Sequence, residues 1–376
     1  MTGARAEKRN KPLPHFVVSS SKKIHGWYDW PYRQCSAERF LLNPYNGCGV
    51  ACFYCYTRSF PGYFQEFHKK GSVYVFKDFD KRIARQLDGI DIGFCGYLSP
   101  VCDPFQAIDK HYNLSLKLIE VFVRRNLPIE VITKERIPEE AIGLLAQQEH
   151  SFGQVSILTL DRKRGRFLSA GPDPQILLDN LKRLRKKRVY AVCRIDPIIP
   201  FITDDREDLR DLMRAARESG ASHIIASVMD IPLKLKGYII ERVRKLSGQD
   251  TAAKLLALYT EKIGYLHAAT AYRKEIFGFL RRQADALGLT FALCMEYERK
   301  DGKVFGLNSE FQSSYSCEGM DTPIYKRRGD RFYPQAGCRG SCLSCVSPLC
   351  GIEELAYART RKHLSLKYGD YRRFSQ

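Results

Sequence analysis

The sequence predicts an α/β fold: a partial, TIM-like (β/α)6 barrel followed by a loop-rich C-terminal extension. Apolar runs of strand length alternate with helical patterns. The runs span 40–42, 92–98, 129–133, 155–160, 190–195 and 223–228, and the helical patterns span 79–87, 112–125, 138–148, 174–188 and 206–219. Strands joined by crossover helices pair in parallel, and right-handed crossovers curl such a sheet toward a barrel.

The chain divides into four segments on this pattern. They are an N-terminal extension (1–39), the barrel (40–232), a helical segment with a closing strand (233–300) and a cysteine-rich tail (301–376). In the barrel's last helix, Asp204 or Asp205 can cap the start and Gly220 the end. The stretch LTFALCMEYE is expected to close one edge of the sheet, and residues 352–368 are expected to form a basic helix.

Composition and length fit one large globular protein. The 376 residues can form a barrel of about 250 residues with appendages, and 44% hydrophobic with 12% aromatic residues excludes a disordered chain. No apolar run approaches a membrane span, and the first residues lack the apolar core of a signal peptide, so we expect a cytoplasmic protein without membrane contact. Thirteen cysteines in such a chain favour metal ligation over disulfides.

The net charge of +19 predicts an anionic partner. Nucleic acid is the first candidate, because basic residues that neutralise phosphates release counterions and so gain affinity. The alternative is a solvated surface with a basic bias. The basic groups are spread over several short blocks, among them the run KRLRKKR at 182–188, and no single block decides between the two.

The cysteines of NPYNGCGVACFYCYTR, residues 43–58, predict a metal cluster. Cys48, Cys52 and Cys55 are spaced so that three thiolates from one loop can bind one small cluster. A [4Fe-4S] cluster normally takes four thiolates, so three leave one iron open to another ligand. The alternative is a zinc site completed by a distant ligand, although zinc sites usually pair their cysteines at short spacing.

This loop resembles the radical S-adenosylmethionine (radical SAM) enzymes, whose motif is C-x3-C-x2-C with an aromatic residue before the third Cys. Four further features resemble the spore photoproduct lyase and the related "DNA repair photolyase"-like group. They are CFYCY in the cluster loop, DPFQ after the second strand, TK after the third and VSILTLD at the fourth. The resemblance covers residues 40–230 and implies the same partial barrel.

The resemblance implies that the chain is an enzyme that binds a [4Fe-4S] cluster and S-adenosylmethionine. An electron from a reductant such as ferredoxin or flavodoxin would cleave S-adenosylmethionine to a 5′-deoxyadenosyl radical, which abstracts a hydrogen atom from the substrate. Lys134 and Ser156 fall where the lyase contacts its cofactor. In the strand-two loop, Ser99 and Asp103 are further candidates for cofactor binding. Arg194, like Lys134, is a candidate to hold the cofactor carboxylate by a charge-assisted bond.

The hydrogen relay of the lyase is matched only in part. Tyr54 and Tyr56 flank the third cluster cysteine as two relay tyrosines do in the lyase, although packing over the cluster would also explain them. The lyase carries a hydrogen-donor cysteine before a Ser-Asp pair, whereas here the order is SPVCDP and Cys102 precedes Asp103 directly. Cys102 is a candidate donor if the loop is shifted, and reversal of thymine dimers does not follow.

The tail predicts a second metal site. Its YPQAGCRGSCLSC repeats the spacing of the first loop, and a fourth cysteine is available. We expect an auxiliary [4Fe-4S] cluster, or else zinc, with the ligands Cys338, Cys342, Cys345 and either Cys350 or Cys317. The remaining cysteines, Cys35, Cys95, Cys193 and Cys294, are expected to be buried structural residues, although the last three could line the barrel.

Three functions remain open on the sequence. The chain could be a radical SAM enzyme that repairs or modifies a nucleic-acid base, which predicts salt-dependent binding of DNA or RNA. It could instead modify a peptide or small metabolite with help from the auxiliary cluster. A metal-binding nucleic-acid module without catalysis is the third, but an open coordination position is typical of catalytic metal sites.

Overall fold

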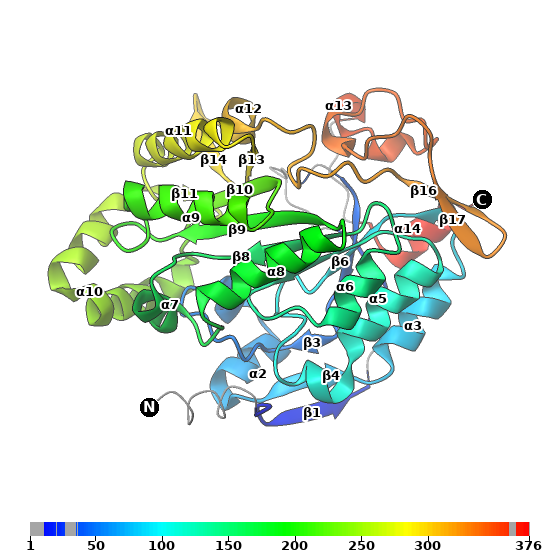
Figure 1. Cartoon of the computed structure of the whole chain (residues 1–376), viewed down its shortest axis with the longest axis horizontal. Coiled ribbons are helices and arrows are strands. Elements are labelled where there is room, and N and C mark those ends of the chain that lie inside the picture. Colours follow the sequence, from blue (N-terminus) through cyan, green and yellow to red (C-terminus); the bar gives the residue numbers. More distant parts are fainter. Residues whose placement is uncertain (1–10, 20, 27–34, 36, 361–365, 376) are drawn as a thin grey trace.

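The computed structural model describes residues 11–19, 21–26, 35, 37–360 and 366–375. Its centre is a parallel sheet of seven strands in the order β13-β10-β9-β8-β7-β6-β2 (Figure 1). The strands are β2 (Arg39–Leu42), β6 (Cys95–Leu98), β7 (Ile129–Thr133), β8 (Phe152–Ser156), β9 (Tyr190–Ile198), β10 (His223–Val228) and β13 (Thr290–Leu293). Six of them are the predicted strands of the barrel, and β13 lies within the stretch predicted to close the edge. The expected α/β fold of partial-barrel type is therefore confirmed.

Helices connect the strands and cover the outer face of the sheet (Figure 1). The crossover helices are α3 (Phe79–Leu87), α5 (Leu114–Arg124), α6 (Glu139–Leu145), α8 (Pro174–Lys186), α9 (Arg206–Glu218) and α11 (Thr270–Ala286). The side chain of Asp205 caps α9 by accepting from the backbone N–H groups of Glu207 and Asp208. Gly220 follows this helix with φ of 105°, as its predicted C-cap role requires.

Several boundaries differ from the expectation: β9 continues to Ile198 instead of ending at residue 195, and α6 ends at Leu145 instead of residue 148. The fourth strand begins at Phe152 instead of residue 155 and ends at Ser156. The mostly apolar residues 157–160, predicted as its second half, belong to the loop that follows it. The run predicted at 92–98 is divided between β5 (Ile92–Gly93), which pairs with a tail strand, and β6. Periodicity alone does not mark where a buried strand changes partner.

The remaining elements surround the sheet. An N-terminal sheet contains β1 (His15–Val18), β4 (Val73–Phe76) and β3 (Tyr45–Asn46). The helices α2 (Tyr63–Lys70), α4 (Asp109–Tyr112), α7 (Arg162–Leu168) and α10 (Lys236–Leu258) belong to connections, as do η1 (Tyr56–Ser59), η2 (Leu233–Leu235) and the hairpin β11 (Glu261–Ile263) with β12 (Tyr265–His267). No helix in the described ranges is both long and apolar enough to cross a membrane.

The tail is built from short elements. They are β14 (Tyr297–Lys300), β15 (Lys303–Gly306), α12 (Asn308–Phe311), β16 (Tyr325–Arg328), β17 (Arg331–Pro334), η3 (Cys342–Ser344), η4 (Glu353–Leu355), α13 (Tyr357–Thr360) and α14 (Tyr368–Arg373). The prediction of a single helix over 352–368 is wrong where the structure describes this stretch, because η4 is a 3-10 turn that the non-helical Ala356 separates from α13, and α14 begins only at Tyr368. Residues 361–365 of the predicted helix lie outside the described residues. Tyr371 of α14 packs against Phe40 and anchors this end of the chain.

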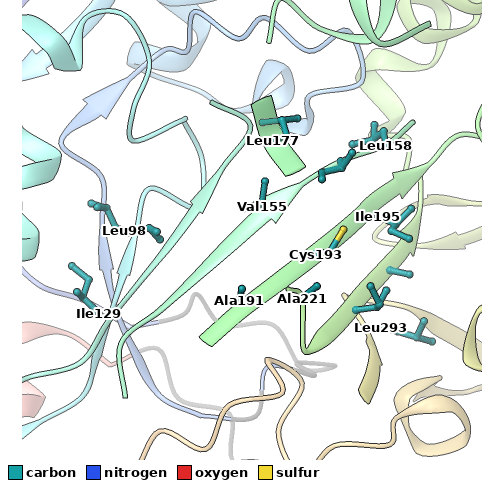
Figure 2. Packing of buried hydrophobic residues seen from close by; sticks show 14 of the residues in the cluster. Leu98, Ile129, Val155, Leu158, Leu177, Ala191, Cys193, Ile195, Ala221 and Leu293 are labelled. Atoms are coloured by element: carbon teal, nitrogen blue, oxygen red, sulfur yellow. The ribbon is translucent and has the colours of Figure 1, made fainter. Parts of the chain in front are cut away.

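The two faces of the sheet differ in character. Outward side chains such as Leu98, Val155 and Cys193 pack under the helices, and Figure 2 shows Ala191, Cys193 and Ile195 on one side of β9. Cys193 is thus a buried core residue. The inner face carries a small apolar cluster of Cys95, Phe152, Val192 and Ile225, and beside it lie the charged side chains described below.

The close fit of this outer layer gives a first prediction. A Cβ on Gly96 would lie 2.7 Å from Cε1 of Phe122 and 3.1 Å from Cγ1 of Ile129. We therefore expect Gly96→Ala to lower the free energy of unfolding by about 1–3 kcal/mol, because overpacking displaces a buried ring. The measurement is the thermal unfolding midpoint, followed by circular dichroism.

The matched control is Gly143→Ala in α6, where a Cβ meets no atom within 4 Å. This helical substitution should be neutral or stabilise the protein by roughly 0.5–1 kcal/mol. Equal midpoints for the two variants would contradict the packing argument.

Candidate active site

The three cluster cysteines lie on a loop at the carboxyl end of β2, between β3 and η1. Their thiols are close enough that one thiol shifts the pKa of the next. Burial raises the pKa of Cys52 to about 11, with a further upward contribution from Cys55 and a downward one from Lys134. Burial likewise raises the pKa of Cys48, and Cys52 adds to that shift. One basic side chain, Lys134, therefore faces this thiol group.

This loop is held by the loop that follows β6. Gln106 is buried and makes two hydrogen bonds to it: Gly49 N donates to Oε1 at 2.9 Å, and Nε2 donates to the Gly47 carbonyl at 3.1 Å. Gly47 has φ of 103°, and a Cβ there would lie 2.6 Å from the ring of Phe67. The loop conformation thus depends on a glycine and on a glutamine that the sequence argument did not select.

The donor chemistry fits a [4Fe-4S] cluster. Three thiols come from one loop, Asp103 N donates to Cys48 Sγ at 3.3 Å, and the Thr57 hydroxyl lies 3.0 Å from Cys55 Sγ. Within the described part of the chain, no three or more His, Cys, Asp or Glu side chains are arranged around a single metal ion. A four-iron cluster instead asks for thiolates on separate irons, and Cys48, Cys52 and Cys55 are the residues that would supply them.

A pocket beside this loop brings together three predicted residues, Tyr54, Lys134 and Ser156. Its wall is completed by the segment from Ile157 to Thr159 and by residues around α7 and the start of α8. Lys134 Nζ donates to the Asp196 carbonyl at 3.4 Å. Tyr54 is buried, and burial next to Cys52 raises the pKa of its phenol well above the usual value. A cation, a hydroxyl and a phenol therefore converge where the ends of β7 and β8 meet the cluster loop.

Tyr56 lies outside this pocket. Its side chain is 39% exposed, and its hydroxyl donates to the Pro100 carbonyl at 2.8 Å. The two tyrosines that flank Cys55 thus have different surroundings, one buried beside the thiols and one at the surface.

Asp103 connects two loops. Its Oδ2 accepts from Lys134 N at 2.6 Å, and its Oδ1 accepts from the Thr133 hydroxyl at 2.8 Å and from Phe105 N at 3.0 Å. Both carboxylate oxygens are used within the protein, so in this structure Asp103 positions Lys134 through its backbone. Ser99, the other candidate in this loop, is buried and has a left-handed backbone with φ of 59°.

Cys102 does not line the pocket of Tyr54 and Lys134, although Cys48 packs against the same apolar cluster. It is buried in a small apolar cluster that includes Tyr45 and Phe67, and its thiol donates to the Tyr45 carbonyl at 3.4 Å. Burial raises its pKa to about 12. The structure does not bring it to the pocket, and its role as hydrogen donor stays a prediction.

Arg194 lies on the inner face of β9 and lines a second pocket, deeper in the barrel. Its guanidinium donates to Gln154 Oε1 at 2.8 Å and to Cys294 Sγ at 3.1 Å, and it forms an ion pair with Asp196. The pocket is lined by Cys35, Tyr97, Arg194, Ile225, Leu293, Cys294, Met295, Cys317 and Glu318. Cys294 thus faces the barrel interior, the less favoured of its two expected roles.

The tail cysteines fall into two groups. Cys350 lies near Cys338 and Cys345, since both thiols add to the upward shift that burial gives its pKa. Cys342 begins the short turn η3 that leads to Cys345. Cys317 instead lies in the second pocket, with its thiol 4.0 Å from Glu318 Oε1. The arrangement favours Cys350 over Cys317 as the fourth member of the tail group.

Comparison with known proteins defines the class. Residues 42–216 match the radical SAM superfamily, so this chain contains a radical SAM domain and is an enzyme. Spore photoproduct lyase with bound AdoMet and dinucleoside spore photoproduct has the same fold, with a TM-score of 0.54 at 15% identity over 74% of this chain and 81% of that chain. The lyase complexed with dinucleoside spore photoproduct gives a TM-score of 0.56 at 15% identity over 74% and 82%.

Two relatives extend the comparison beyond the domain. A radical SAM Nα-GlyT isomerase of Pseudomonas phage M6 is 28% identical over 94% of this chain and 78% of its own length. An uncharacterised protein of Mycobacterium tuberculosis is 23% identical over 54% of this chain, which spans 62% of that relative. The isomerase therefore aligns with nearly the whole chain.

The two hydrogen bonds from Gln106 to the cluster loop give a second prediction. Gln106→Ala should weaken cluster retention, because it removes two buried hydrogen bonds, each worth about 1–3 kcal/mol when a buried partner is left unpaired. After anaerobic reconstitution, iron per chain should fall faster in the variant than in the native protein during incubation with a chelator. The electron paramagnetic resonance signal that changes on addition of S-adenosylmethionine should weaken with it.

Gln65→Ala on the exposed face of α2 is the matched control and should behave as the native protein does. Unchanged iron retention in Gln106→Ala would contradict a clamping role for this glutamine.

Proposed function

We propose that this radical SAM enzyme acts on a base of a nucleic acid, which it repairs or modifies. The observation that carries the proposal is the net charge of +19. A chain this basic attracts a nucleic acid by its phosphate charges, independently of the base sequence. One comparison agrees with it, because the lyase of the same fold has been solved with a dinucleoside photoproduct. The radical SAM isomerase that aligns with 94% of the chain supports the radical chemistry but does not decide the substrate class.

The two pockets suggest a division of labour. When bound, the cluster and S-adenosylmethionine supply one-electron cleavage of the sulfonium and abstraction of a hydrogen atom. Cys48, Cys52 and Cys55 would hold the cluster, and Lys134 would bind the carboxylate of S-adenosylmethionine in the pocket shared with Ser156. Arg194 lines the second pocket instead of the pocket of Lys134, so we assign it to the substrate. Tyr54 is buried and lines the pocket of Lys134, whereas Tyr56 is exposed, so we assign the relay role to Tyr54 first.

We also propose a second metal site in the tail, formed by Cys338, Cys342, Cys345 and Cys350. A [4Fe-4S] cluster is our first assignment and zinc the alternative, since four cysteines at short spacing suit both. The electron for the first cluster would come from a small reductant protein such as ferredoxin or flavodoxin.

A third prediction tests the substrate class. The reconstituted enzyme, given dithionite and S-adenosylmethionine, should form more 5′-deoxyadenosine when DNA or RNA is added than when peptide pools or small metabolites are. The stimulation should fall steeply between 50 and 200 mM salt, by about 10³-fold or more if six phosphates are contacted.

The variant with Cys48, Cys52 and Cys55 all changed to Ala should form no 5′-deoxyadenosine under any of these conditions. Stimulation by peptides or metabolites, with no effect of either nucleic acid, would transfer the proposal to the peptide or metabolite class.

A fourth prediction separates the candidate tail ligands. Cys350→Ala should lose about four irons per chain on reconstitution if the tail holds a [4Fe-4S] cluster, or one zinc if it holds that ion. Cys317→Ala, the matched control, should retain the native metal content because its thiol lies in the barrel pocket. Metal loss in Cys317→Ala alone would reverse the assignment.

A further inference from the structure

The inner face of the barrel carries a continuous belt of polar contacts. Arg39 of β2 donates to Glu130 of β7 at 3.0 Å, and Glu130 accepts from Gln154 of β8 at 2.8 Å. Gln154 also accepts from Arg194 of β9, which pairs with Asp196. In its turn Asp196 accepts from Ser227 of β10. The belt crosses the sheet from β2 to β10, with members on five of these six adjacent strands and none on β6. All of its members except Asp196 are more than nine-tenths buried.

The tail adds one further member, Glu318. The segment around it enters the barrel at the amino ends of the strands: Tyr190, the first residue of β9, donates to the Gly319 carbonyl at 3.1 Å, and the His223 ring of β10 lies 3.2 Å from the Cys317 carbonyl. Gly319 has φ of 75°, and a Cβ there would lie 2.4 Å from the His223 ring. These contacts fix Glu318, whose Oε2 accepts from Gln154 Nε2 at 2.6 Å.

The charges of this interior do not balance. Arg39 pairs with Glu130, and Arg194 pairs with Asp196. Glu318 is 7% exposed, lines the second pocket, and forms no ion pair in the described part of the chain. Burial and the nearby Glu318 together raise the pKa of Glu130 to about 8. The described residues of this interior thus hold two guanidinium groups and three carboxyl groups, and either a proton on Glu130 or a bound cation must balance the third carboxylate. A buried charge left unbalanced would be strongly destabilising.

We propose that Glu318 is a specificity-determining residue that binds a positively charged, hydrogen-bond-donating group of the substrate, such as a primary amine. The carboxylate lies in the pocket that also holds Arg194 and Tyr97, and a cation bound there would neutralise the excess charge. This inference rests on the proposed function, because it places the amine on a nucleobase. It also gives the tail a direct role in substrate binding.

Two measurements test it on the reconstituted holoenzyme with S-adenosylmethionine. The first is formation of 5′-deoxyadenosine with DNA oligonucleotides that carry one 5-aminomethyluracil, one 5-hydroxymethyluracil or only thymine. The second is calorimetric binding of 5-aminomethyl-2′-deoxyuridine and its hydroxymethyl analogue as free nucleosides, which requires neither turnover nor a nucleic acid. In both, we expect the amine to be preferred about tenfold or more, since removing one partner of a buried charge pair has effects of this size.

Glu318→Gln keeps the shape and the hydrogen bond from Gln154 but removes the charge, and it should abolish the preference for the amine. Glu310→Gln is the matched control, because Glu310 is exposed and pairs with Lys274 outside the barrel. It should keep the full preference. Circular dichroism and iron content show whether each variant is folded and loaded.

The inference is overturned if the native enzyme does not prefer the amine nucleoside, including when it binds neither nucleoside, or if Glu318→Gln keeps the preference. The proposed function fails separately. If no nucleic acid stimulates formation of 5′-deoxyadenosine but the amine nucleoside binds through Glu318, the carboxylate assignment stands and the nucleic-acid substrate does not.

Discussion

Burial of opposite charges inside the barrel is the constraint on which the rest of this structure depends. Among the described residues, two arginines and three carboxyl groups form this interior pattern, and each must find a partner there because a lone buried ion is strongly destabilising. The belt from Arg39 to Ser227 meets that need with side chains from five of the six adjacent strands between β2 and β10. It also occupies most of their hydrogen-bonding capacity, so the groups left for a ligand are few. Glu318 is one of them.

The two ends of the barrel perform different tasks. At the carboxyl ends of the strands, Gln106 and Asp103 join neighbouring loops so that the cluster cysteines and Lys134 face one region. At the amino ends, the tail pairs with β5 through β16 and inserts the segment that carries Glu318. Figure 1 shows the tail elements α13, β16 and β17 at the opposite end of the sheet from α7 and α10. The chemistry and part of the substrate site thus reach the barrel from opposite sides.

Much of this could be predicted where local pattern determines structure. Strand-length apolar runs predicted six of the seven strands and the closing stretch, and the C-x3-C-x2-C spacing placed the cysteines on the right loop. Contacts between segments that lie far apart in the sequence could not be predicted from local pattern. Gln106 stands in a DPFQ sequence whose polar residue gave a weak signal, whereas nothing local distinguishes Glu318 from a surface glutamate. Cys102 was a candidate donor by resemblance and Cys317 an alternative tail ligand, and only the fold shows one thiol against Tyr45 and the other in the barrel pocket.

The position of these charges along the chain bears on how substrates are assigned within this superfamily. The radical SAM match covers residues 42–216, and it contains the cluster cysteines, Lys134 and Ser156. Arg39 and Glu318 lie outside it, on opposite sides in sequence, yet they meet Glu130 and Gln154 inside the barrel. A domain match therefore identifies the radical chemistry but omits part of the charge pattern that a substrate would contact. For this reason substrate assignment by domain alone is weak here, and a relative that aligns over the tail is a better guide than one that shares only the fold.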